Sequence, residues 1–210
     1  GVYFAPGASA DVGGLVATTL AIGVDEFMAG STTFSRNGST GAVVNEGTLQ
    51  ARYGGYIALL APEVVNSGVV MARAGTVALA AGEAVELQFA GGALTKLRVE
   101  PATVAALIEN RQAVQAPDGT ILMSARAAQA LGGSVIRHSG ELAADSLQAQ
   151  GGRIVLEADR IELAAGSSTS ARGATGGGDI RIGGGWQGSG DTYQAREVLL
   201  AAGASVDASA

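Results

Sequence analysis

The sequence predicts an all-β fold, a parallel β-helix in which the chain winds into a stack of coils made of short strands. One residue pattern recurs at a nearly constant spacing, and such self-similarity is the signature of a repeat architecture. Within each repeat the apolar residues stand two apart, which is the periodicity of strands with one buried face. Gly, Asn, Asp and Ser separate these runs, and we expect them to supply the positive φ angles of sharp corners.

The clearest repeat is the segment 66–79, NSGVVMARAGTVAL, and its spacing returns in 110–123, NRQAVQAPDGTILM. Gly55 and Gly75 lie 20 residues apart, and Gly75 and Gly119 lie 44 apart, which is twice 22. A period near 20 suits a coil of two or three short strands. Two further segments keep the pattern around one extra residue or a short insertion, 45–59 and 138–156. The positions that define the repeat are Asn45, Gly47, Gly55, Asn66, Gly68, Gly75, Asn110, Gly119, His138, Gly140 and Gly152.

Stacking explains how such coils fold. Hydrogen bonds are expected to hold the strands of neighbouring coils roughly 4.8 Å apart, the usual strand spacing. One coil cannot bury its inward residues alone, but a stack makes a continuous apolar column. Ala fills many inward positions, which fits a narrow interior. The Leu-x-x-Leu-x-Leu frame of a leucine-rich repeat is absent from the sequence, so the β-helix is favoured over a horseshoe.

Two polar positions follow from the same alignment. Asn45 and Asn66 lie one coil apart, and we expect their amides to stack as a ladder along the axis. His138, the only His, occupies the corresponding position and predicts a corner residue that tolerates an unusual backbone conformation. A Ser-His-Asp triad would need His138 to face a cleft, and nothing in the sequence supports this.

Three segments interrupt the pattern and predict small elements outside the β-helix, residues 21–40, 89–109 and 124–133. The first contains Phe27 and Met28 and predicts a side element laid on the helix or capping one face. We otherwise expect residues 1–210 to form one elongated β-helical domain cut from a longer protein.

The second and third interruptions have a more specific interpretation. LTKLRV alternates like a hairpin strand, and PATVAALIE predicts a short helix with Pro101 near its first position, where the missing N–H does no harm. SARAAQAL predicts a helical turn with Ser124 as its N-cap. The coil is expected to resume at Ser134, and Gly-rich residues 166–190 predict longer corners or a loop.

Composition excludes several classes of protein. The hydrophobic content of 47% suffices for a substantial core, whereas 4% aromatic residues and 33 Gly favour tight repeats over an ordinary globular core. The net charge of −6 does not resemble a nucleic-acid-binding surface or a polybasic membrane patch. The absence of Cys excludes disulfides and thiolate metal sites.

No constellation of residues predicts catalysis, a cofactor or a metal. Residues 183–188 satisfy G-x-G-x-x-G but sit in no βαβ unit. Carboxylates are densest at Glu83 with Glu86 and at Glu157, Asp159 and Glu162. Glycoside hydrolysis needs two carboxylates about 5–10 Å apart, and Ca²⁺ needs six or more oxygens. Glu157 and Asp159 are expected on one outer face near an Arg, as on a solvated surface.

Several segments resemble the haemagglutination-activity, or two-partner-secretion, domain of large bacterial exoproteins related to filamentous haemagglutinin. GVYFAPGASADVGGLVATTL looks like the stretch that follows the family's Asn-Pro-Asn-Gly motif. NEGTLQARYGGYIALLAPEVVNSGVVMARAGTVALAAGEAVEL looks like the family's successive coils, and SARAAQAL followed by His138-Ser139-Gly140 fits as well. The family's Asn-Pro-Asn segments would lie upstream of this sequence, so no transporter-recognition residue is transferred.

The resemblance implies a right-handed β-helix with extra-helical elements and a secreted, non-enzymatic function. It implies export through the periplasm, recognition by an outer-membrane transporter of the Omp85 type, and adhesion at the cell surface through host or cell-surface glycans or proteins. Two alternatives remain open at this point, a polysaccharide-acting β-helix enzyme and a self-assembling extracellular fibre subunit whose coil ends associate.

Overall fold

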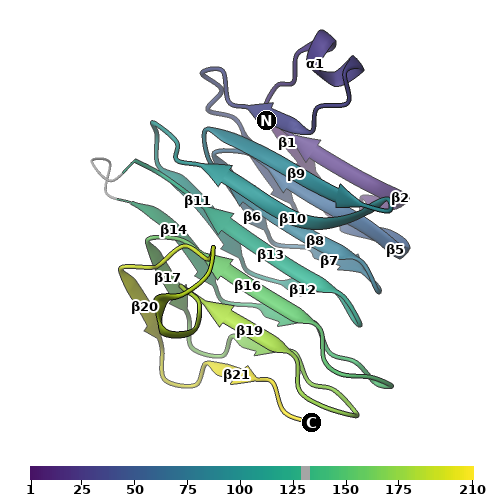
Figure 1. Cartoon of the computed structure of the whole chain (residues 1–210), viewed down its shortest axis with the longest axis vertical. Helices are drawn as coiled ribbons and strands as arrows, with labels where there is room; N and C mark the ends of the chain where they lie inside the picture. Colours follow the sequence, from purple (N-terminus) through teal and green to yellow (C-terminus); the bar gives the residue numbers. More distant parts are fainter. Residues whose placement is uncertain (129–132) are drawn as a thin grey trace.

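The computed structural model describes residues 1–128 and 133–210 as a stack of parallel β-coils (Figure 1). The N-terminus lies near one end of the stack and the C-terminus at the other. The first sheet holds one strand from each coil: β1 (Val2–Phe4), β4 (Ala42–Asn45), β6 (Glu63–Asn66), β11 (Ala106–Asn110), β14 (Ser134–His138), β17 (Arg160–Leu163) and β20 (Glu197–Leu200). The predicted parallel β-helix is confirmed.

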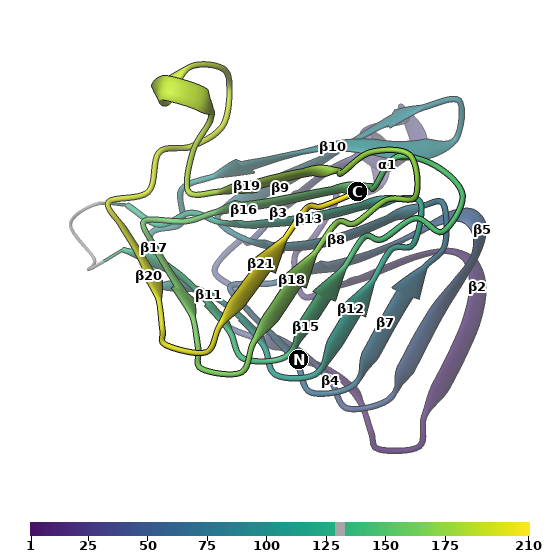
Figure 2. The same ribbon diagram turned by 90° about the horizontal axis from the view of Figure 1, so that it is seen from below.

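A second parallel sheet supplies the other two faces of each coil, as the view along the stack shows (Figure 2). It bends because the first half of β5 (Thr48–Leu60) pairs with β7 (Val69–Ala72) and its second half with β8 (Thr76–Ala81). On the β7 side lie β12 (Ala113–Gln115), β15 (Glu141–Ala143), β18 (Ser168–Ser170) and β21 (Ser205–Asp207). On the β8 side lie β13 (Thr120–Ala125), β16 (Arg153–Glu157) and β19 (Asp179–Ile182), and β2 (Ser9–Thr18) pairs with both halves of β5.

The core is a column of aligned apolar side chains inside the coils. One row runs through the first sheet with direct register between neighbouring strands: Val43, Val64, Ile108, Ile136 and Ile161. All five are fully buried. Strand alternation places every second residue on this inner face, so the period-two pattern of the sequence becomes one continuous apolar interior.

Glycines at the corner between the two faces of the second sheet allow the coils to stack closely. A Cβ on Gly75 would lie 1.9 Å from the carbonyl oxygen of Gly55, and a Cβ on Gly119 would lie 2.2 Å from that of Gly75. The Gly75 carbonyl accepts the N–H of Thr120 at 2.9 Å, which holds the two coils together at this point. The stack of glycines continues through Gly152 and Gly178.

These repeat glycines are therefore not required for positive φ, as the sequence had suggested, but for close approach of backbones. The positive φ angles fall on the residues just before them, Gly54 (75°), Ala74 (50°) and Asp118 (59°). A left-handed residue turns the chain, and the glycine that follows fits beneath the carbonyl of the neighbouring coil.

An antiparallel sheet outside the β-helix covers part of its outer surface. It consists of β3 (Thr33–Ser35), β9 (Ala84–Ala90) and β10 (Ala93–Glu100). Its inner side chains and the outer ones of β5, β8, β13 and β16 form a second apolar cluster that includes Leu60, Leu87 and Leu94. The first interruption also contains helix α1 (Val24–Met28), which lies at the N-terminal end of the stack in Figure 1.

The boundaries of the second interruption differ from the expected 89–109. The excursion begins with β9 at Ala84, inside the segment expected to be regular coil, and LTKLRV is the β10 strand of a hairpin, as its alternation indicated. The expected helix in PATVAALIE is wrong, because Ala106–Asn110 is strand β11 of the first sheet. Pairing with β6 on one side and β14 on the other outweighs the helical propensity of this segment.

The third interruption, expected at 124–133, is also corrected at its start. Ser124 is not a helix N-cap but lies within β13, and its hydroxyl donates to Glu157 Oε2 at 3.2 Å. The rest of the expected helical turn extends into residues 129–132, outside the described part of the chain. The coil resumes at Ser134 with β14. Over the described residues no helix has the length and apolar character needed to cross a membrane.

We expect Gly75→Ala to destabilise the protein severely, because backbone atoms surround the missing Cβ and cannot move without opening the stack. The cost should exceed about 3 kcal/mol, equivalent to a fall in Tm of roughly 10 °C. Thermal unfolding followed by circular dichroism measures this. Gly13→Ala is the matched control, because a Cβ at Gly13 meets no atom within 4 Å. Equal melting temperatures for the two variants would contradict the stacking argument.

Candidate functional site

A buried polar ladder crosses four coils along the inner face of the first sheet. Its members are Asn45, Asn66, Asn110 and His138, the last residues of β4, β6, β11 and β14, and all four are fully buried. Asn45 Nδ2 donates to Asn66 Oδ1 at 2.8 Å, and Asn66 Nδ2 donates to Asn110 Oδ1 at 2.8 Å. The ladder expected for two residues therefore extends over three amides and one imidazole.

The ladder has one direction. Each amide nitrogen donates toward the C-terminal end of the stack, and Asn110 Nδ2 approaches His138 Nδ1 at 3.2 Å. His138 Nε2 faces the Ser168 carbonyl at 3.1 Å. The carbonyl can only accept, so Nε2 carries the proton and Nδ1 accepts from Asn110. The amide oxygens are also used, since Asn45 Oδ1 and Asn66 Oδ1 accept the N–H groups of Gly47 and Gly68.

This arrangement favours neutral His138. Burial lowers the pKa of His138 below its ordinary value of 6.5, and this effect outweighs the backbone hydrogen bonds that favour the charged form. A proton on Nδ1 would face the donating amide nitrogen of Asn110. Reversing the Asn110 amide would then place two nitrogens together at Asn66, so a charged His138 conflicts with the whole ladder.

His138 stands at the end of its strand, directly before the corner at Ser139 and Gly140, but without the unusual backbone conformation that the sequence suggested. His138 ends strand β14, pairs in register with Asn110, and does not have a positive φ. Its two ring nitrogens are bonded within the protein interior, so it faces no cleft and provides no general base. Gly47, Gly68 and Gly140 lie just beyond the ladder residues, where a Cβ would meet a neighbouring backbone oxygen at 2.5, 2.1 and 1.9 Å.

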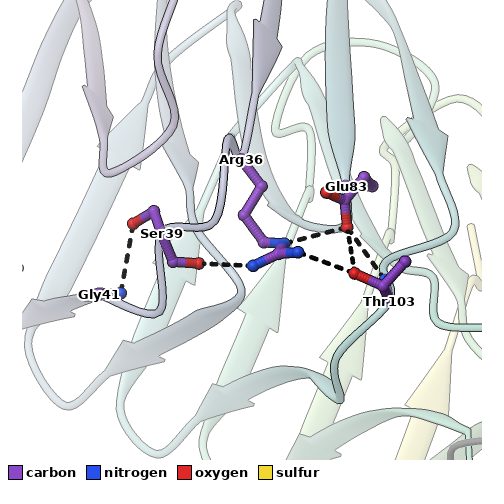
Figure 3. Close-up of polar contacts among 5 residues, drawn as sticks. All are labelled: Arg36, Ser39, Gly41, Glu83 and Thr103. Atoms are coloured by element: carbon purple, nitrogen blue, oxygen red, sulfur yellow. Dashed lines mark hydrogen bonds and ion pairs between the residues drawn. The ribbon is translucent and has the colours of Figure 1, made fainter.

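The extra-helical elements are fastened by a second polar cluster centred on Arg36 (Figure 3). Its guanidinium donates to Glu83 Oε2 at 3.0 Å, Thr103 Oγ1 at 2.8 Å and the Ser39 carbonyl at 3.2 Å. Glu83 Oε2 also accepts from the Thr103 amide at 3.0 Å. Arg36 and then Thr103 hold the pKa of Glu83 below its usual range. Three segments far apart in sequence thus meet at one buried guanidinium.

The remaining candidate carboxylates also hold structure together. Asp159 is buried, and its Oδ2 accepts the Ser134 amide at 3.0 Å while its Oδ1 accepts the Tyr193 hydroxyl. Glu157 Oε1 accepts the Tyr193 amide at 3.2 Å. Burial acts to raise the pKa of Asp159, but the hydrogen bonds from Tyr193 and Ser134 outweigh it and the pKa is lowered. The pair therefore anchors a loop, and Asp159 is not solvated as expected.

Glu86 and Glu162 likewise contact neighbours on the surface. Glu86 accepts from the Gln88 side chain at 3.2 Å, and Glu162 pairs with Arg137 and Arg160 at 3.4 and 2.7 Å. Within the described residues no group of three or more His, Asp or Glu side chains is placed to hold a metal ion. The residues that sequence reasoning missed are Arg36, Thr103, Ser134 and Tyr193, because their partners lie 20 to 67 positions away.

The G-x-G-x-x-G match at 183–188 is part of a projecting loop that opens no α-helix. Gly183, Gly184 and Gly188 have positive φ, and residues Trp186–Gly188 form a single 3₁₀ turn, η2. The loop is closed at its base by the Ala195 amide, which donates to the Gly183 carbonyl at 2.8 Å. A dinucleotide-binding βαβ geometry is therefore contradicted at this position.

Comparisons with known proteins agree with this architecture. The family model described as the TPS secretion domain matches residues 1–182. The crystal structure of the HMW1 secretion domain from Haemophilus influenzae is similar, with a TM-score of 0.71 and 22% sequence identity. The match covers 99% of this chain but 61% of the HMW1 chain, so this chain spans less than two thirds of that domain. The search of curated proteins finds no match.

Asn66→Ala should destabilise the protein by about 2–4 kcal/mol, because it leaves buried partners in Asn45 and Asn110 without their hydrogen bonds. Chemical denaturation measures the change in the free energy of unfolding. Gln50→Ala on the exposed side of β5 is the control and should change it by less than about 0.5 kcal/mol. A loss no larger than that of the control would show that the ladder contributes nothing.

The stability of the protein should also depend on the protonation of His138 as the pH falls below about 7. Because the pKa of His138 is lower in the folded state, the unfolded chain takes up a proton first as the pH falls. The stabilisation is therefore complete above the ordinary pKa of 6.5 and is lost as the pH falls from there through the folded pKa.

His138→Asn tests this dependence, because Asn occupies the same position in three neighbouring coils and does not titrate. Unfolding free energies measured at closely spaced pH values should decline for the parent and stay nearly constant for the variant over this interval. Parallel curves for the two proteins would be incompatible with a neutral, ladder-bound His138.

Proposed function

Because the chain belongs to the TPS secretion domain family, we propose that it directs a secreted exoprotein to an Omp85-type transporter for export across the outer membrane. The family match is the observation that carries this proposal. It runs from the first residue to Ile182 and so includes every coil through β19 and the extra-helical sheet. The family is a two-partner-secretion module and not a family of enzymes.

The chemistry of the structure supports a non-enzymatic function. Each carboxylate group that the sequence suggested for catalysis is used in a hydrogen bond or ion pair with neighbouring residues. Buried Asp159 and partly exposed Glu83 each join separate segments of the chain. A hydrolase needs a carboxyl group free to transfer a proton to its substrate, so these arrangements favour a binding and targeting module over a polysaccharide-acting enzyme.

We propose that the partner-binding surfaces lie on the protrusions, which are the elements outside the β-helix, including helix α1 and the antiparallel sheet. Helix α1 exposes Val24, Phe27 and Met28 at 77%, 64% and 78%. Large exposed apolar side chains gathered on one small element are typical of interaction sites. These protrusions suit the transporter during export and a cell-surface partner during adhesion. End-to-end association of copies into fibres stays a prediction.

Export is tested by expressing the full-length exoprotein in a Gram-negative host with and without its cognate transporter. We expect the exoprotein to reach the cell surface or medium only when the transporter is present and residues 1–182 are intact, and otherwise to remain periplasmic. The periplasmic and external fractions are compared by immunoblotting. Release that is independent of the transporter, or of residues 1–182, would refute the proposed function.

A further inference from the structure

The turn between β3 and β4 holds the only Asn-Gly pair of the chain, Asn37-Gly38. The two residues have φ angles of 46° and 82°, and the Ser39 amide donates to the Arg36 carbonyl at 2.8 Å, as in a type I′ turn. Asn and Gly tolerate such angles better than other residues, which explains their presence in the turn. Both residues are exposed to water.

An Asn followed by Gly is also chemically reactive, because Gly has no Cβ to keep the side-chain amide away from its nitrogen. When the Gly38 nitrogen attacks Asn37 Cγ, an N–Cγ bond forms, the Cγ–Nδ2 bond breaks, and ammonia leaves with the proton of the Gly38 amide. Water then opens the resulting succinimide ring. Breaking the new N–Cγ bond gives aspartate, and breaking the original peptide bond gives isoaspartate.

The structure leaves both reacting groups available. Over residues 1–128 and 133–210, neither the Gly38 N–H nor the Asn37 side chain forms a hydrogen bond. A Cβ at Gly38 would meet no atom within 4 Å, so the space beside its nitrogen is open. The other three Asn residues are the fully buried ladder members Asn45, Asn66 and Asn110, and none of them precedes a Gly. The chemistry is therefore confined to one position.

This turn is joined to the Arg36 cluster that fastens the antiparallel sheet (Figure 3). The Ser39 carbonyl accepts from the Arg36 guanidinium at 3.2 Å. The same guanidinium, on a side chain only 10% exposed, bonds Glu83 and Thr103. Isoaspartate takes the backbone through Cβ and Cγ, which lengthens the turn by one atom between Arg36 and Ser39. The Ser39 carbonyl then shifts relative to a guanidinium whose other contacts are fixed.

We propose that Asn37 is a site of spontaneous deamidation in the folded protein, and that its isoaspartate product loosens the antiparallel sheet where Arg36 fastens it. The reaction requires no enzyme, and water is its only co-reactant. It adds one negative charge to a chain whose net charge is −6. The modified fraction rises with the age of the folded protein, whether or not the chain directs export.

Peptide mapping by mass spectrometry, after incubation of the folded protein in neutral and mildly alkaline buffers, tests the reaction. We expect aspartate and isoaspartate at position 37, formed faster at the higher pH because the attacking nitrogen must lose its proton. The ladder Asn residues become accessible only when the coils unfold, so they should react at least about 1,000-fold more slowly. Asn37→Gly, which keeps a residue suited to positive φ, is the control and should gain no charge.

Two results would overturn the site: an Asn37 that stays intact in the folded protein while it reacts in the urea-unfolded chain, or a faster reaction at a ladder Asn. The structural consequence is measured by hydrogen exchange on the isoaspartate form, separated by anion-exchange chromatography. Amides of β3 and β9 should exchange roughly tenfold faster than in the unmodified protein, and those of β6 and β11 at an unchanged rate.

Freshly prepared Asn37→Asp is the matched control for this measurement, because it carries the added charge without the longer backbone. Its amides should exchange as in the parent. Unchanged exchange in the isoaspartate form would overturn the loosening of the sheet, and equal acceleration in Asn37→Asp would overturn its assignment to the lengthened turn. Circular dichroism shows that each form is folded before exchange is measured.

Discussion

The structure depends on coils lying directly on one another in parallel register. Inter-coil backbone hydrogen bonds set the distance between neighbours, and at the glycine corners that distance leaves no room for a Cβ. The carbonyl that excludes it also accepts the N–H of the next coil, as Gly75 does from Thr120 and Gly119 from Arg153. Close approach and hydrogen bonding are thus the same contact, and the apolar rows can align only because the corners permit it.

The interior is not entirely apolar, and its polar part reinforces the register. Each Asn of the ladder bonds its equivalent on the next coil, so a shift by one residue would leave several buried amides without partners. His138 ends the row and turns its second nitrogen to the Ser168 carbonyl in the next sheet. Because every donor points the same way, the protonation state of one imidazole is tied to the orientation of three amides.

Elements outside the coils depend on this scaffold in a different manner. The antiparallel sheet shares an apolar cluster with the outer face of the second sheet, and Arg36 joins its connecting segments. Tyr193 fastens the projecting loop to the coils by donating its hydroxyl to Asp159. The repetitive part of the chain therefore provides a rigid support, while the side chains available for recognition lie on non-repeating segments, as expected for function grafted on a fold.

Sequence alone determined the β-helix, because alternation with period two and the recurrence of Asn and Gly are local signals that every coil repeats. It also indicated the family and the hairpin strand in LTKLRV. It could not give the reason for the repeat glycines, since the carbonyl that each one faces belongs to a neighbouring coil. Likewise, Ala106–Asn110 looks helical by itself and becomes a strand because β6 and β14 flank it.

Tertiary structure alone decided the environment of the polar residues. Arg36 meets Glu83 and Thr103 across 47 and 67 positions of sequence, and Asp159 meets Tyr193 across 34. No periodicity links such residues, because each pair occurs once and at least one partner lies in a segment that leaves the repeat. The physical reason is that the residue pattern of every coil specifies the repeated contacts. The unique contacts form only after the coils have brought distant segments together.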